Sequence, residues 1–147
     1  NKNIVDHRNF DHRGVKFKFN RKNKLIRQEF YQDGLLHREY EPAVRIWKNE
    51  GILIEKWMRD GIFSDTQKPS IVARKNSIII CEKWFENGVF HRNDGPAIID
   101  QHKNKLEYFW YQNGKLHGED GPCHQEWKII DGKKYLIEEY KNKNLNH

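Results

Sequence analysis

Residues 87–97 read Asn-Gly-Val-Phe-His-Arg-Asn-Asp-Gly-Pro-Ala, and residues 113–122 repeat most of this stretch as Asn-Gly-Lys-Leu-His-Gly-Glu-Asp-Gly-Pro. Three markers recur in one register along the 147-residue chain, with the first glycines 27, 27 and 26 residues apart. A period of this length is typical of repeat architectures. The markers are a glycine (Gly34, Gly61, Gly88, Gly114), a proline eight residues later (Pro42, Pro69, Pro96, Pro122) and an aromatic residue four residues earlier (Phe30, Trp57, Trp84, Trp110).

Each marker has a local structural meaning. Asp-Gly and Asn-Gly pairs form turns, because glycine accepts a positive φ without a Cβ clash, so we expect each pair to end a strand. Proline has no amide donor and is tolerated as the first residue of a strand. We therefore expect one β-hairpin per repeat, followed by a seven-residue loop, and little helix.

The expected fold is all-β. It is an array of about five stacked antiparallel hairpins, in a single layer or open meander sheet, that forms one domain over residues 1–147. The approximate units are 1–34, 35–61, 62–88, 89–114 and 115–147. Atypical first and last units fit a repeat array.

Large side chains recur on the second strand of each hairpin. Ile26, Leu53, Ile80 and Leu106 precede the aromatic residue of their unit by four, an even spacing that places both on one face. We favour a core role for the aromatic row, because only 36% of the chain is hydrophobic and 13% is aromatic. The alternative is a stacking platform for bases, interleaved with Lys56 and Lys83.

The loop between glycine and proline offers the candidate interaction residues. They are His37, Arg38, His91, Arg92 and His117. Equivalent histidines should lie about 9.6 Å apart, too far to share a zinc ion, so we expect no metal and predict that they bond the turn or pack on a tryptophan. One interpretation is that the arginines bind acidic partners. The other is that they are solvated or paired with aspartate. The third unit has Ser64 at the histidine position, so a site read once per repeat should be silent there.

Charge and cysteine content limit the function classes. The net charge of +6 favours anionic partners, but the lysines and arginines are scattered. Cys81 and Cys123 are far apart and match no disulfide framework or zinc motif, which indicates a reducing compartment. The longest apolar run, Ile78–Cys81, is too short for a transmembrane segment, and no signal peptide is visible. We expect a cytoplasmic or virion-associated protein.

Residues 87–97 and 113–122 resemble the Asn-Gly-Lys-Leu-His-Arg-Glu-Asp-Gly-Pro-Ala repeats of large DNA viruses, phages and some bacteria, which are variants of the MORN repeat. The resemblance extends over residues 30–122. It implies an extended single-sheet array of hairpins without intrinsic catalysis, used for protein interaction, assembly or sometimes lipid contact.

The sequence contains no Gly-x-Ser-x-Gly or phosphate-binding loop, and we expect neither enzyme activity nor a cofactor. The leading hypothesis is a scaffold for protein–protein interaction or assembly, such as a viral structural or accessory protein. One alternative is a nucleic-acid or anionic-lipid binding module that uses the positive charge. Another is an antitoxin-like neutralising protein. Open sheet edges also predict strand addition and self-association.

Overall fold

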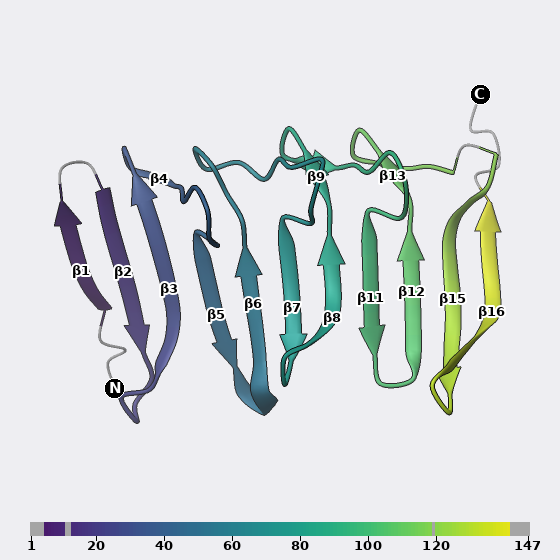
Figure 1. The fold of residues 1–147 in the computed structure, drawn as a ribbon, viewed down its shortest axis with the longest axis horizontal. Helices are drawn as coiled ribbons and strands as arrows, with labels where there is room; N and C mark the ends of the chain where they lie inside the picture. Colours follow the sequence, from purple (N-terminus) through teal and green to yellow (C-terminus); the bar gives the residue numbers. More distant parts are fainter. Residues whose placement is uncertain (1–4, 11–12, 119, 142–147) are drawn as a thin grey trace.

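The computed structural model describes residues 5–10, 13–118 and 120–141. The outermost residues of the first and last expected units lie outside these ranges. The long strands form one antiparallel sheet in which each strand pairs with the next long strand along the chain, and the sheet does not close into a barrel (Figure 1). The expectation of an all-β, open meander of hairpins is confirmed. Within the described ranges, the sole helical element is the 3-10 turn Asn49–Gly51.

The long strands run from one end of the sheet to the other in sequence order. They are β1 (Val5–Phe10), β2 (Arg13–Phe19), β3 (Leu25–Gln32), β5 (Val44–Lys48), β6 (Ile52–Lys56), β7 (Ile71–Lys75), β8 (Ile78–Lys83), β11 (Ile98–His102), β12 (Lys105–Phe109), β15 (Pro122–Ile130) and β16 (Lys133–Lys141). The strands begin two residues after Pro42, Pro69 and Pro96, and at Pro122 itself.

A second, short hairpin is centred on the repeat glycine, and the sequence interpretation did not include it. Asn87 and Gly88 both have positive φ, 51° and 80°, which is the geometry of a two-residue hairpin turn. This turn joins β9 (Phe85–Glu86) to β10 (Val89–Phe90). Equivalent hairpins join β13 (Tyr111–Gln112) to β14 (Lys115–Leu116) and the end of β3 to β4 (Leu35–Leu36), and the third unit has one bridge between Arg59 and Ile62. The expectation of one hairpin per repeat was therefore incomplete.

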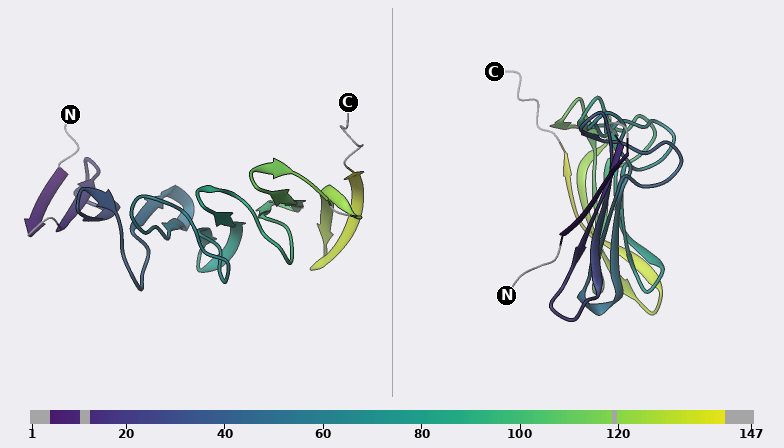
Figure 2. Two further views of the ribbon diagram at one scale, coloured as in Figure 1. Left: turned by 90° about the horizontal axis from the view of Figure 1, so that it is seen from above. Right: turned by 90° about the vertical axis from the view of Figure 1, so that its left-hand side faces the viewer.

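The short hairpins gather at one end of the long strands. Figure 2 shows the thin slab from above and from its side, with the short hairpins and loops together at the upper end. Backbone bonds connect these parts to the sheet. The N–H of Trp84 donates to the carbonyl of Ala97 at 2.7 Å, and Phe30, Trp57 and Trp110 make the same bond to Ala43, Ser70 and Cys123. Ala43 and Ala97 are fully buried as a result.

The core lies under the short hairpins rather than along the middle of the sheet. Ala43, Val44 and Met58 are buried together, with Leu36, Ile46 and Phe63 packed against them. Beyond them a ladder of rings continues through Phe63, Phe85, Phe90 and Tyr111, with successive centroids 4.8, 4.6 and 5.2 Å apart. Such tilted ring pairs add stability beyond the area they bury.

The expected aliphatic row is interrupted. Ile26 and Ile80 fall at register shifts, where β3 and β8 each carry one residue without a Cα partner on the neighbouring strand. A bulge of this kind breaks the alternation of side chains between the two faces. The even spacing in the sequence therefore does not produce one continuous row.

Candidate interaction surfaces

The loop histidines hold the next short hairpin along the chain. Nδ1 of His37 accepts a hydrogen bond from the backbone N–H of Asp60 at 3.0 Å, and Nδ1 of His91 accepts one from Asn113 at 3.0 Å. Asp60 and Asn113 each precede the glycine of the next short-hairpin turn, Gly61 and Gly114. In the third unit, Oγ of Ser64 accepts from the N–H of Asn87 at 3.1 Å. The unit expected to be silent thus makes the same contact with a hydroxyl group.

Backbone bonds reinforce this connection. The N–H groups of Gly61, Gly88 and Gly114 donate to the carbonyls of Leu36, Phe63 and Phe90, at 2.8, 2.9 and 2.9 Å. Each short hairpin is therefore bonded to the one before it, and the short hairpins form a second ladder beside the main sheet. His117 is exposed, and its backbone N–H donates to the carbonyl of Trp110 at 2.8 Å.

The loop cations lie over the aromatic row. The guanidinium carbons of Arg38 and Arg92 lie 3.8 Å from the ring centroids of Phe30 and Trp84, and Nζ of Lys68 lies 3.4 Å from that of Trp57. These distances are typical of cation–π contacts. Arg38 also pairs with Glu41, and Arg92 donates to the Pro96 carbonyl at 3.2 Å.

These contacts leave little of the aromatic row open to a ligand. Trp84 is 9% exposed, while Phe30, Trp57 and Trp110 are half-buried. A base that stacked on Phe30, Trp57 or Trp84 would need the ring face that the cation occupies. The structure therefore places most of the predicted interaction residues in contacts within the chain.

One face of the sheet carries charged residues that are unevenly distributed along it. Residues that are Cα partners across successive strands, together with the residues two positions along, point to the same face. On this charged face cations predominate on β2 to β8, the basic half, where Glu29 is the one carboxylate among the described residues. The carboxylates Asp100, Glu107, Glu126 and Glu138 lie on β11 to β16, the acidic half, together with Lys105 and Lys128. The cations of the basic half include Lys16, Arg27, Lys56 and Lys83.

The lowered pKa of Lys56 reflects its burial and the concentration of positive charge in the basic half. Partial burial lowers its pKa, and the nearby cations of Arg27, Lys83 and Lys48 lower it further. Glu29 offsets this only in part, because it already accepts hydrogen bonds from Arg27 and Tyr31. Among the described residues, no carboxylate lies within ion-pair distance of Lys56 or Lys83.

The acidic half contains a cluster that sequence reasoning missed. Glu107, His124 and Glu126 can bring ligand atoms within 4.8 Å of one another. His124 is stacked between Phe109 and Tyr140, and its Nε2 lies 3.0 Å from Glu107. The three residues come from neighbouring strands without a motif spacing, so only the register reveals them.

Lys105 supplies the positive charge that this cluster of carboxylates attracts. Nζ of Lys105 lies 3.4 Å from a carboxylate oxygen of Glu107 and 3.5 Å from one of Glu126. The described residues therefore present an ion network that is neutralised by lysine, and we assign no metal to it.

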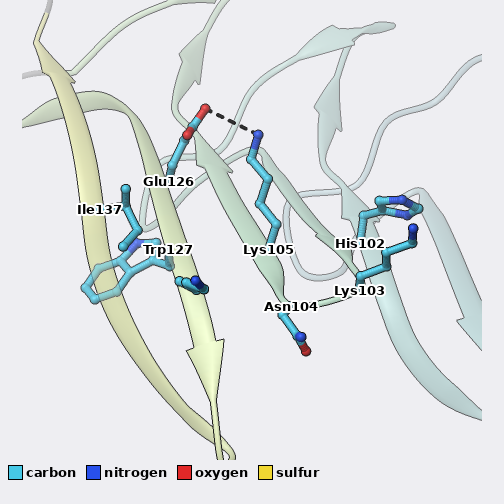
Figure 3. Close-up of a pocket in the computed structure, with 8 residues that line it drawn as sticks. His102, Lys103, Asn104, Lys105, Glu126, Trp127 and Ile137 are labelled. Atoms are coloured by element: carbon cyan, nitrogen blue, oxygen red, sulfur yellow. Dashed lines mark ion pairs between the residues drawn. The ribbon is translucent and has the colours of Figure 1, made fainter.

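A shallow groove adjoins this network. It lies between the turn of β11 and β12 and the last hairpin, and Figure 3 shows Trp127 and Ile137 beside the ion pair of Lys105 with Glu126. The other lining residues are His102, Lys103, Asn104 and Lys128. The groove combines an apolar wall with a charged rim, and Ile137 joins it to the edge of the sheet.

Strand β16 forms that edge. Within the described part of the chain it pairs with β15 alone, and all nine of its residues are exposed. Four are large apolar residues: Tyr135, Leu136, Ile137 and Tyr140 are 50%, 46%, 59% and 41% exposed. Exposed apolar residues on an edge strand are a template for pairing with another chain.

No family model, curated protein or solved structure matches the chain. In the part of the chain that the structure describes, no helix has the length and apolar character needed to cross a bilayer.

Proposed function

We propose that the protein is a non-enzymatic repeat scaffold for protein–protein interaction or assembly, built as an array of about five hairpin repeats with β16 as its contact surface. The observation that carries the proposal is the exposure of four large apolar side chains on this nine-residue edge strand. The resemblance to MORN-type repeats implies the same use, including a structural or accessory role in a virus.

A protein partner fits this surface because an added strand can use two kinds of contact at once. Backbone groups along the edge can bond to the new strand, while alternate side chains give specificity. The loops are less suited to this role, because His37, Ser64 and His91 already hold the following turns. A protein partner would therefore bind to the last hairpin.

The proposal can be tested with the immobilised full chain and lysate of the cells that produce it. The variant Leu136→Lys/Ile137→Lys should lose its bound protein, because two charges replace the exposed apolar centre of β16. Ile78→Lys is the matched control, since Ile78 is 69% exposed at the turn end of β8. A recovered protein must then bind the purified chain saturably. Equal recovery by the wild type and the β16 variant would count against β16, and recovery of background proteins alone, with no self-association, would remove the proposal.

A second candidate function, binding of an anionic ligand, is favoured by the unpaired cations around Lys56. Two lysines without carboxylate partners on one face attract phosphate groups. On β11 to β16 of the same face Lys105 and Lys128 accompany the carboxylates, so the excess of positive charge ends at β8 and favours a short ligand. The test is a salt titration with a labelled oligonucleotide and with phosphatidylserine vesicles. Binding that weakens with salt and is lost in Lys56→Glu/Lys83→Glu supports it, and indifference to both probes at low salt excludes it.

A further inference from the structure

We infer that β16 binds a second copy of this chain, by antiparallel pairing of the two β16 strands about a two-fold axis perpendicular to the sheet. The inference rests on the proposed function, in which β16 is the contact surface, and it names the partner. Three observations support a second copy: the direction of the end strands, the register allowed by a bulge, and the order of charges along β16.

The number of strands sets the direction of pairing. Eleven strands follow one another in the sheet with antiparallel neighbours, so β1 and β16 run in the same direction, as their arrows show (Figure 1). Head-to-tail contact between copies would therefore pair β16 with β1 in parallel. A two-fold axis instead makes the two β16 strands antiparallel, which continues the pattern of the sheet and gives the slightly more stable ladder.

The bulge in β16 restricts the register. Leu136 is the partner of Trp127, but Glu138 is the partner of Glu126, so Ile137 is the extra residue. Lys134 and Glu139 therefore share the face of Ile129 and Gln125, while Tyr135 and Glu138 share the other face. A two-fold axis perpendicular to the sheet keeps each face on its own side. The register that matches faces places Lys134 opposite Glu139 and Tyr135 opposite Glu138 of the second copy.

The charges along β16 favour this register. The strand begins with Lys133 and Lys134 and carries Glu138 and Glu139 near its end. Antiparallel pairing brings lysine opposite glutamate twice, with Leu136 and Ile137 at the centre, whereas parallel pairing would place lysine beside lysine. Lysines and bulges usually protect edges against pairing. In β16 the lysines and the bulge disfavour other registers, whereas in this register Lys134 lies opposite Glu139.

The test is sedimentation equilibrium of the full chain over a wide range of concentration. We expect a monomer–dimer equilibrium. Lys134→Glu and Glu139→Lys should each weaken the dimer about tenfold, because each puts two like-charged pairs across the interface. The double variant Lys134→Glu/Glu139→Lys should restore it. Within one chain these residues are five positions apart on a strand, roughly 17 Å, so an intrachain pair cannot produce the rescue.

Circular dichroism of each variant controls for folding, since Nζ of Lys134 also lies 4.7 Å from the ring centroid of Trp127. A monomer at every concentration, a ladder of larger oligomers, or a double variant as weak as the single ones would overturn the inference. If the chain is monomeric while the β16 variant still loses another bound protein, the two-fold dimer is wrong and the proposed function stands.

Discussion

The hydroxyl of Ser64 accepts a hydrogen bond from the backbone N–H of Asn87, at the position where Nδ1 of His37 and His91 accept from the turns of the next short hairpins. Two different side chains thus make one contact in successive units. What the position requires is an acceptor that holds the next turn. The loop residues therefore act first as connections along the array.

Replacing His91 with alanine should lower the free energy of unfolding by about 1 kcal/mol, because the N–H of Asn113 loses its acceptor. His91→Asn should cost less, since its side-chain oxygen can replace Nδ1. Urea denaturation measures both, with the exposed Thr66→Ala as the control. Equal losses for alanine and asparagine would show that the ring's packing matters and the hydrogen bond does not.

The ring ladder should be the most sensitive part of the core. Phe85 is 7% exposed and lies between Phe63 and Phe90, so Phe85→Ala should destabilise the fold by about 3 kcal/mol or more. Ile78→Ala is the matched control at an exposed site and should stay within about 0.5 kcal/mol of the wild type. Similar urea midpoints for the two variants would place the core elsewhere.

The cations over the aromatic row should contribute stability through the ring beneath them. Arg92→Ala should cost about 1 kcal/mol, and Arg92→Lys less, because Lys68 occupies the same position over Trp57. The measurement is a double-mutant cycle with Trp84→Leu. A smaller cost of Arg92→Ala in that background is expected. The same cost in both backgrounds would mean that Arg92 acts through its bonds to Asp94 and Pro96 and not through the ring.

Cys81 should react slowly with alkylating agents. Burial, and secondly the Asp100 carboxylate, raise the pKa of this thiol to about 11 from an ordinary value of 9.0. The folded state thus favours the protonated thiol of Cys81. Its contribution to the free energy of unfolding is complete below pH 9 and is lost as the pH rises towards 11. Peptide mass spectrometry should find half-maximal iodoacetamide reactivity near pH 11, and faster reaction at pH 8 in Asp100→Asn. Half-maximal reaction near pH 9 would contradict the assigned surroundings.

The sequence predicted those parts of the fold that depend on neighbouring residues. The Asn87–Gly88 turn depends on two adjacent residues that accept positive φ, and the strands around it follow from alternation. The short hairpins were missed, because their stability comes from bonds to the preceding short hairpin or turn, such as Gly88 to Phe63. One signal for them was present. Phe63 and Phe90 stand at the same position of their units, as do Phe85 and Tyr111.

The candidate surfaces were harder to predict than the turns. The acidic and basic halves of the charged face arise only when the register places Glu107 opposite Glu126, and Lys56 and Lys83 on either side of Ile71. The bulges at Ile26 and Ile80 shift that register by one residue, and no local sequence feature predicts these bulges. The interaction residues predicted in the loop were recognisable as a repeated motif, but repetition alone could not distinguish binding to a partner from binding to the next turn of the same chain.

Amide hydrogen exchange at low and high protein concentration tests the division of roles most directly. If β16 is the contact surface and the loops hold the array together, those amides of residues 133–140 that point away from β15 should gain protection as the concentration rises. The amides of Asp60, Asn87 and Asn113 should be equally protected at both concentrations, because their acceptors lie within the same chain. Protection that rises at these turn amides while β16 is unchanged would contradict the account.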